Sequence, residues 1–450
     1  TNANQLVASF RAPAVATATQ LAFKLEITSR DGLVTNNTVT LTVTPITLDF
    51  TAVPHSLADV VTVPAGYSVS VLYRLGDPIA SGVAAYANNG TDTNFAQRAG
   101  DHHDGMSYFG LAASGTSPDP TNSTRGLLVL NHENISEQYL HVNGQSPAPR
   151  PESEAIKEIE CHGVSVIEVT RTNGAWSYVQ ASGLNRRITP NTPMAFSGPV
   201  KGNGWLKTAY SADGTMGRGT INNCANGYTP WGTYLTCEEN WNGYFANAGT
   251  ITPEQRRYGV TAAGAGYRWH EYDGRFDAAA NPNEPNRFGW VVEIDPFDPA
   301  AQPVKRTALG RIKHEGAALA LTADGRVVYY MGDDQQFEYI YKFVSRDRMQ
   351  PGGAKANAHL LDHGTLYVAR FDASGQGEWL ALEQLPKAAQ KLDQLPKEKP
   401  TPNQNKTATG VWLSLIPKFS LDDFNDEVVE LFKIYLINST DKGYHFNYQQ

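Results

Sequence analysis

The most constraining feature of this sequence is a series of short apolar segments, each closed by Gly, Asp, Asn or Pro. β-Branched and aromatic residues dominate these segments, which predicts strands rather than helices. Strands of this kind, recurring along one chain, favour an all-β fold, with a β-propeller preferred over a large β-sandwich. The segments are RGLLVLNHE (125–133), GVSVIEV (163–169), WGTYLTCEE (231–239), GWVVEIDP (289–296), GRVVYYMGDD (325–334), EYIYKFV (338–344) and GTLYVARFD (364–372).

Composition narrows the classes of function. The chain has 450 residues, with 40 Gly, 26 Pro and 21 Tyr, which suits many short strands joined by turns. Its 37 Lys and Arg against 45 Asp and Glu give a net charge of −8 without a basic run, so we expect no nucleic-acid partner. No apolar window is long enough to predict a transmembrane segment. The opening TNANQLVASF does not resemble a signal peptide, so we expect a mature, trimmed or intracellular chain.

The chain divides into four predicted regions. Residues 20–45 predict two strands around SRDG and TNN turns, and the second strand resembles the closing strand of an immunoglobulin-like module. A segment rich in Lys, Pro and Gln reads as a linker. The predicted regions are the tail of an immunoglobulin-like β module (1–48), a propeller domain (49–384), the linker (385–410) and a small C-terminal β-rich segment (411–450).

Carboxylates and histidines gather at predicted strand ends. A propeller directs strand ends from several blades at one axial pocket, and hard cations such as Ca²⁺ bind scattered carboxylates of this kind. Together the clusters predict a metal site more strongly than any one of them does. They are DHHDGM (101–106), NHEN (131–134), ECHG (160–163), CEEN (237–240) with KHEG (313–316), and GDD (332–334).

The stretch NNCANGYTPWGTYLTCEENW (222–241) holds two of the three cysteines around a predicted tight turn. Alternation along the second strand places Cys237 and Glu239 on one face and Glu238 on the other. Two interpretations follow. Cys224 and Cys237 form a disulfide, or Cys224 as a thiolate and Glu239 bind the same metal cluster.

The same stretch, extended to GTINNCANGYTPWGTYLTCEENW, resembles the hallmark segment of the PhoX family of calcium- and iron-dependent alkaline phosphatases. HHDGMSYFGL, GLLVLNHEN, CHGVSVIEV, RRITPNTPMAFSGP, LGRIKHEGAALAL and GDDQQFEYIYKFVS follow in the family's order, so the resemblance covers about residues 55–384. It implies a six-bladed propeller whose axial pocket holds Fe³⁺ and Ca²⁺ ions. The pattern stops after about Leu382, which predicts a truncated ring. Three interpretations follow: a divergent or composite chain, a ring whose remaining blades come from self-assembly or a partner chain, or a reduced metal cluster.

The resemblance also assigns site residues. It implies that Cys224 is the family's thiolate ligand, and that Glu239 and Glu315 are the carboxylates of the CEEN and KHE motifs. These three residues are the expected catalytic group. Further expected metal ligands, from matching segments, are Glu133, Asp104, Asp333 and Asp334.

Other polar residues receive supporting roles. The histidines beside acidic motifs are expected to hydrogen-bond to the ligands or to be structural. A Cys161–His162 nucleophile pair is disfavoured, because neighbours in a strand point to opposite faces. Three basic residues could bind phosphate but are more readily explained as surface charges: Arg186, Arg187 and Lys313.

The function expected from these residues is hydrolysis of small phosphomonoesters by a secreted, periplasmic or cell-surface alkaline phosphatase. The alternative is a non-catalytic surface or assembly protein with a Ca²⁺-binding propeller. A lactonase-like propeller with one Ca²⁺ is a weaker alternative, because such a site has no use for the Cys224 thiolate.

Overall fold

The computed structural model describes residues 12–45, 50–372 and 376–382. The chain divides between Val71 and Leu72 into two compact units. The predicted linker at 385–410 and the predicted C-terminal segment at 411–450 lie outside the described residues.

The first unit contains an antiparallel hairpin, β1 (Thr19–Thr28) and β2 (Val34–Val43). The SRDG segment forms the predicted turn, in which Ser29 N donates to Leu33 O over 2.8 Å. The predicted TNN turn is wrong, because residues 35–37 lie inside β2 and pair with residues 25–27 of β1. Continuous pairing along the ladder outweighs the local turn preference of asparagine.

The second unit contains three sheets in its described part. The first sheet has the order β3-β4-β5-β6, with β7 also paired to β5, and its strands are antiparallel. Its strands are β3 (His103–Gly110), β4 (Arg125–His132), β5 (Gly163–Thr172), β6 (Ala175–Tyr178) and β7 (Arg186–Ile188).

The second sheet has the order β10-β11-β12-β13-β8-β9. All its neighbours are antiparallel except β13 and β8, which are parallel. Its strands are β8 (Pro193–Ser197), β9 (Met216–Arg218), β10 (Asn223–Tyr228), β11 (Tyr234–Glu238), β12 (Val291–Ile294) and β13 (Val304–Arg306).

The third sheet is an antiparallel meander in chain order. Its strands are β14 (Ala318–Leu321), β15 (Arg326–Gly332), β16 (Ile340–Arg348), β17 (Gly364–Phe371) and β18 (Gly377–Ala381). Every segment predicted as a strand from its apolar run contains a strand of these sheets, so that part of the prediction is confirmed.

Short helices connect the strands. The helices are α1 (Glu137–Leu140), α2 (Glu152–Cys161), α3 (Pro253–Arg257) and α4 (Gly353–Asn357), and the 3-10 turns are η1 (Phe95–Gln97), η2 (Gly204–Leu206), η3 (Trp241–Tyr244), η4 (Trp269–Glu271), η5 (Gly274–Phe276), η6 (Glu284–Arg287), η7 (Thr307–Leu309) and η8 (Ala358–Leu361). The ECHG cluster (160–163) therefore spans the last residues of α2 and the first residue of β5, so it lies at a strand end, as predicted, but begins on a helix, which was not predicted. Ala155 and Ile159, four residues apart, bury one face of α2. Among the described residues, no helix has the length and apolar character needed to cross a bilayer.

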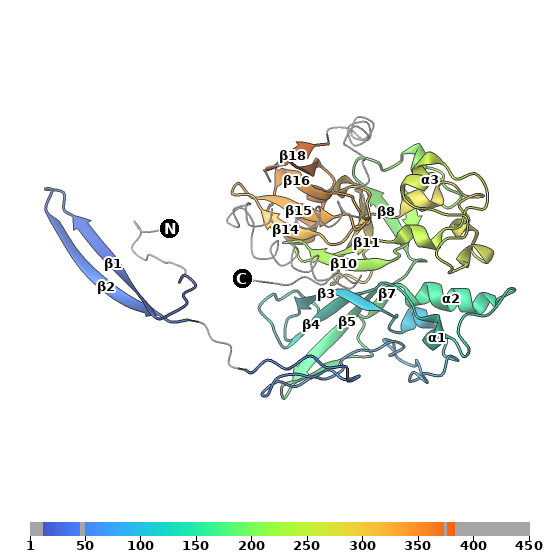
Figure 1. The fold of residues 1–450 in the computed structure, drawn as a ribbon, viewed down its shortest axis with the longest axis horizontal. Coiled ribbons are helices and arrows are strands. Elements are labelled where there is room, and N and C mark those ends of the chain that lie inside the picture. The colour runs from blue at the N-terminus through green and yellow to red at the C-terminus, as the bar shows by residue number, and fades with distance from the viewer. Residues whose placement is uncertain (1–11, 46–49, 373–375, 383–450) are drawn as a thin grey trace. The chain divides into compact units, whose positions relative to one another are not determined.

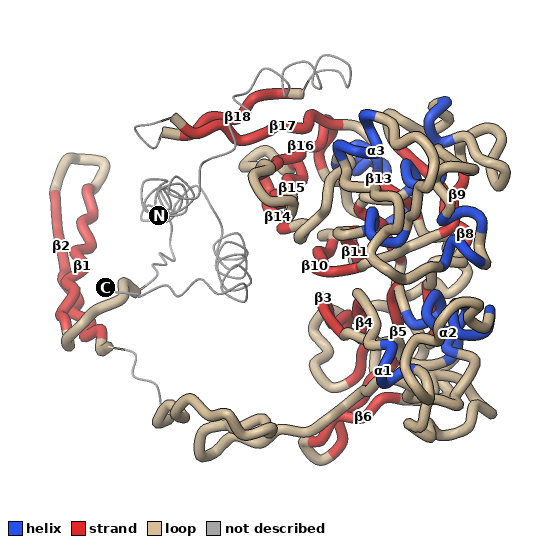
Figure 2. Tube along the Cα trace, turned by 45° about the vertical axis from the view of Figure 1, so that its right-hand side comes forward, coloured by secondary structure: helices blue, strands red, loops and turns tan. Residues whose placement is uncertain are grey.

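Two apolar cores join the three sheets. One core packs the second sheet against the third, through residues such as Leu235, Tyr329 and Phe343. Another packs the first sheet against the second, through Val166 and Tyr234 among others. As a result β10 lies between β3 and β14 (Figure 1, Figure 2), and segments far apart in the sequence meet along it.

Candidate metal centre

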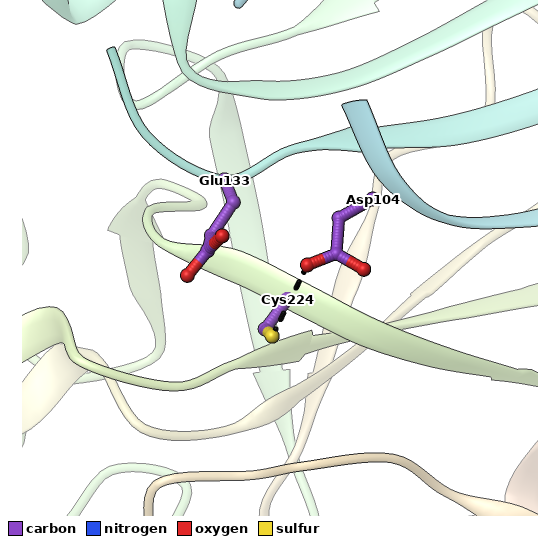
Figure 3. Close-up of side chains that lie close together, drawn as sticks. All are labelled: Asp104, Glu133 and Cys224. Carbon is purple, nitrogen blue, oxygen red and sulfur yellow. Dashed lines mark hydrogen bonds between the residues drawn. The ribbon is translucent and has the colours of Figure 1, made fainter. Parts of the chain in front are cut away.

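Four carboxylates and one thiol converge around β10. One donor atom from each of Asp104, Glu133 and Cys224 lies within 4.8 Å of the others, and the same holds for Cys224, Glu239 and Glu315. Cys224 Sγ lies 3.2 Å from Asp104 Oδ2 and 3.4 Å from a Glu315 carboxylate oxygen. Figure 3 shows Glu133 and Asp104 directed at Cys224 from neighbouring segments. Cys224 is therefore shared by both groups of donors.

Two β-bulges aim these side chains. The ladder between β3 and β4 shifts by one residue between His103 and Met106, the segment that contains Asp104. The ladder between β10 and β11 shifts in the same way between Asn223 and Asn226, the segment that contains Cys224. A bulge bends its strand and redirects a side chain, so each shift turns one donor toward the other.

Two glycines allow the strands to come close enough. A Cβ at Gly105 in β3 would stand 2.9 Å from the backbone of Ala225 and Asn226 in β10. A Cβ at Gly227, on the other side of the bulge, would stand 2.1 Å from the carbonyl oxygen of Ala317. Only a residue without a side chain fits at either contact, and these contacts bring Asp104 and Glu315 to Cys224.

The adjacent glutamates of the CEEN motif have different environments. Glu238 is fully buried and accepts hydrogen bonds from Lys305 Nζ (2.6 Å), Thr220 and two backbone amides. Glu239 follows the end of β11 and belongs to the donor group instead. The predicted division of the pair between two faces is present, with Glu238 in an internal ion pair.

The two aspartates of the GDD motif also have different environments. Asp334 lies close enough to Glu133, Glu239 and Glu315 to raise the pKa of each. The structure does not bring Asp333 to this group. Burial raises the pKa of Asp333 to about 7, and the charged side chains that act on it are Glu338 and Arg257.

Without a cation, burial and mutual repulsion destabilise the charged forms of the carboxylates and of the thiol. Burial, followed by Asp104, raises the pKa of Glu133 to about 7. Burial and Asp334 raise the pKa of Glu315 to about 8, and burial raises the pKa of Glu239 well above its usual range. The Cys224 thiol also has a raised pKa, from burial and from the surrounding carboxylates. Buried like charges of this kind need protons or cations.

The donor set fits a metal ion. Glu239 Oε1 is buried and accepts no hydrogen bond from the described residues, so its lone pairs are not used by protein donors. Carboxylate oxygens suit hard cations and a thiolate suits a transition metal, and in each group here the donor atoms of both kinds lie within 4.8 Å of one another. A cation would stabilise the deprotonated form of every member.

The disulfide interpretation is wrong. All three cysteines are free, and Cys237 is fully buried in the core between the second and third sheets. Cys237 packs among apolar side chains of that core, whereas Cys224 belongs to the donor group. Cys161 is buried at the end of α2 and is equally free.

The histidines beside the acidic motifs bond to protein groups and lie outside the donor group. The partners are Ser136 for His102, Tyr73 by ring stacking for His103, Ser165 for His132, Tyr244 for His162 and Gly310 O for His314. Burial lowers the pKa of His162 and of His314 to about 4, so both rings are neutral near pH 7.

The guanidinium groups of the two arginines bind main-chain carbonyls and are not free surface charges. The Arg187 guanidinium donates to the carbonyl oxygens of Phe95, Arg98, Glu160 and His162. Arg186 donates to carbonyls around residues 184 and 295–296. Lys313 Nζ donates to Gln335 Oε1 over 2.6 Å and lies near enough to Glu239 to lower its pKa.

Sequence reasoning missed two buried asparagines that support the group. Asn131 Nδ2 donates to Cys224 O over 2.6 Å, and its Oδ1 accepts from Tyr234 and Thr236. Asn222 precedes the bulge in a left-handed conformation with a φ of 48°. An amide inside the apolar run LLVLNHE, and a second one directly before the cysteine motif, were the available signals.

The fold and the donor group together define a mostly β protein with a candidate metal centre at the junction of its sheets. The family model described as Alkaline phosphatase PhoX matches residues 48–411, which is most of the chain. The chain belongs to this family. The predicted family and fold class are thereby confirmed, while the number of blades stays a prediction.

A solved structure supports the same assignment. It is described as Pseudomonas fluorescens PhoX in complex with vanadate, a transition state analogue, and shares 48% sequence identity with this chain at a TM-score of 0.70. The similarity covers 74% of this chain and 58% of the solved one, so this chain spans well under two thirds of that protein. No curated protein matches the chain.

Proposed function

We propose that this protein hydrolyses phosphomonoesters at a metal centre held by Cys224 and the carboxylates around it. One observation carries the proposal. The Cys224 thiol belongs to both groups of buried carboxylates, and the negative charges of these carboxylates need a cation. The family of the chain and the vanadate complex of the related structure support phosphoryl transfer as the reaction.

The ligand chemistry favours two kinds of ion. The Cys224 thiolate suits Fe³⁺, and the carboxylates of Asp104, Glu133, Glu239 and Glu315 suit both Fe³⁺ and Ca²⁺. Asp334 contributes further negative charge beside three of them. When bound, such ions supply Lewis-acid polarisation of a phosphoryl oxygen and an oxygen nucleophile at moderate pH.

The residues of the chain have three tasks in this proposal. The bulges and the close contacts at Gly105 and Gly227 fix the donors before a substrate arrives. The carboxylates stay deprotonated while the cations are bound. Lys313, next to Glu239, adds positive charge where a phosphate dianion would enter.

The enzyme is favoured over the alternatives. The non-catalytic surface protein has no observation in its favour, and Cys224 within the donor group argues against a site for one Ca²⁺ alone. The small phosphoester substrate and a secreted, periplasmic or cell-surface location remain part of the proposal. So does completion of the ring by self-assembly or a partner chain.

The test is a phosphatase assay coupled to metal removal. Hydrolysis of p-nitrophenyl phosphate is measured for the purified full chain, after chelation, and after Fe³⁺ and Ca²⁺ are returned. We expect activity that chelation abolishes and that the two ions together restore. Activity that survives full removal of metal would overturn the proposal, as would a metal-loaded protein without turnover.

A further inference from the structure

Asn222 contacts the main chain on both sides of the donor group. Its carbonyl oxygen accepts a hydrogen bond from Glu239 N over 2.9 Å. Its side-chain Nδ2 donates to Glu133 O over 3.3 Å, and its Oδ1 accepts from Asn240 N. One buried residue, 3% exposed, therefore links the backbone of the first sheet's ligand to that of the second sheet's ligand.

The direction of the hydrogen bonds requires an amide at this position. His162 Nδ1 faces Glu158 O at 2.7 Å and must donate, so its Nε2 accepts from the Tyr244 hydroxyl at 2.9 Å. The Tyr244 oxygen then accepts from Asn222 Nδ2 at 3.2 Å. The second hydrogen on Nδ2 serves Glu133 O. The NH₂ group thus satisfies two buried acceptors, which neither aspartate nor glycine can do.

The backbone conformation limits the choice further. The φ of 48° at Asn222 lies in the left-handed region, which asparagine, aspartate and glycine tolerate best. Among these three residues, only asparagine also supplies two donors. The rings of Tyr244 and Tyr267 stack at 4.2 Å, so the tyrosine that Asn222 contacts is itself fixed.

We infer that Asn222 is a positioning residue that sets the spacing of the Glu133 and Glu239 carboxylates without binding metal itself. This inference rests on the proposed metal centre. It differs from a merely structural role in one respect: loss of the Asn222 amide should weaken ion binding in protein that is still folded.

The experiment compares Asn222→Gly with wild type and with Asn173→Gly. The first substitution keeps the left-handed backbone and removes the amide. Asn173 has nearly the same φ, 52°, but lies exposed at the turn between β5 and β6, so it controls for the backbone change. Ca²⁺ is titrated calorimetrically into metal-free protein, and folding is checked by circular dichroism.

We expect Asn222→Gly to bind the same number of Ca²⁺ ions as wild type, with a Kd about 10- to 100-fold weaker, the range typical for groups that support metal ligands. Asn173→Gly should match wild type. A Glu239→Gln variant, which removes a ligand, should lose an ion instead. An unchanged Kd in folded Asn222→Gly would overturn the inference, as would the loss of an ion in that variant.

A second variant tests the inference if Asn222→Gly does not fold. Tyr244→Phe removes the hydroxyl that Asn222 contacts, together with the 3.4 Å contact of that hydroxyl with Glu133 O, but leaves the Asn222–Glu133 contact. A weakening of a few-fold is expected, and an unchanged Kd would contradict the inference. Wild-type protein that binds no Ca²⁺ and no Fe³⁺ would instead overturn the proposed metal centre. The two failures are therefore distinguishable.

Discussion

Gly227 and Ala317 touch so closely that a Cβ on Gly227 would stand 2.1 Å from the Ala317 carbonyl oxygen. This contact joins the edge of the second sheet to the segment that carries Glu315, and Ala317 N also donates to Asn226 O. The absence of a side chain at one position thus decides whether a carboxylate from a different sheet can reach Cys224.

A Gly227→Ala substitution should therefore lower both stability and metal binding. The methyl group would have to displace backbone, so we expect a loss of about 3 kcal/mol or more in the free energy of unfolding, at the upper end of overpacking costs. Urea unfolding measures this. Gly183→Ala is the matched control, because nothing lies within 4 Å of a Cβ there. Equal stabilities for the two variants would contradict the proposed role of the contact.

The pair Asp333 and Asp334 offers an internal comparison. Asp334→Asn should weaken metal binding, because Asp334 acts on three carboxylates of the donor group. Asp333→Asn should leave metal binding unchanged, because Asp333 belongs to neither group of donors around Cys224. The number and affinity of bound Ca²⁺ ions can be measured by calorimetry for both variants. The reverse ranking would show that the assignment within the motif is wrong.

The Lys305–Glu238 pair should be far more sensitive than a surface pair. Both side chains are fully buried, and Lys305→Met would leave the Glu238 carboxylate without its counter-ion. We expect a loss of about 3–5 kcal/mol in the free energy of unfolding. The double variant Lys305→Met with Glu238→Gln should recover part of it. The exposed Lys201→Met is the control, and a Lys305 variant as stable as this control would refute the prediction.

The metal-free protein should lose stability as the pH rises from about 6.5 to 8. The folded state raises the pKa of Glu133 to about 7 and that of Glu315 to about 8, from an ordinary value of 4.5, so it binds more protons than the unfolded chain in this interval. Below pH 6.5 the buried His162 and His314, with pKa values lowered to about 4, have the opposite effect. Stability is therefore compared only at pH 6.5 and above.

The measurement is the melting temperature of chelated and metal-loaded protein at pH 6.5 and pH 8. Chelated protein should melt at a lower temperature at pH 8 than at pH 6.5. Metal-loaded protein should show a smaller decrease, since bound cations keep the site carboxylates deprotonated while Asp333, outside the donor group, still has a pKa raised to about 7. A chelated protein that becomes more stable toward pH 8 would contradict the electrostatics of the donor group.

Much of this arrangement follows from the sequence, because local patterns determine it. Apolar runs closed by turn residues predicted the strands. The cysteine motif and the resemblance to the family predicted Cys224, Glu239 and Glu315, which the structure brings together. The bulges at Asp104 and Cys224 were not predictable, because a one-residue shift in register depends on the partner strand. The separation of Asp333 from the donor group was not predictable either, because it depends on how the chain turns after β15.

Helix α2 and the partners of the arginines were not predicted from the sequence, for a related reason. The start of α2 has acidic residues in its first turn, and Ala155 and Ile159 share a face, but the segment is short and its other apolar positions are few. Arg187 looked like a surface charge because its acceptors are backbone carbonyls from distant segments. Long-range partners of this kind leave no local pattern in a sequence.

The central claim is that Cys224 and its surrounding carboxylates hold metal ions, iron among them. The most direct test is the metal content of purified wild-type protein and of Cys224→Ser, with Cys237→Ser as the control thiol. We expect at least one iron per chain, roughly, in wild type and in Cys237→Ser, and loss of that iron in folded Cys224→Ser. Iron that is absent from wild type, or retained in full by Cys224→Ser, would contradict it.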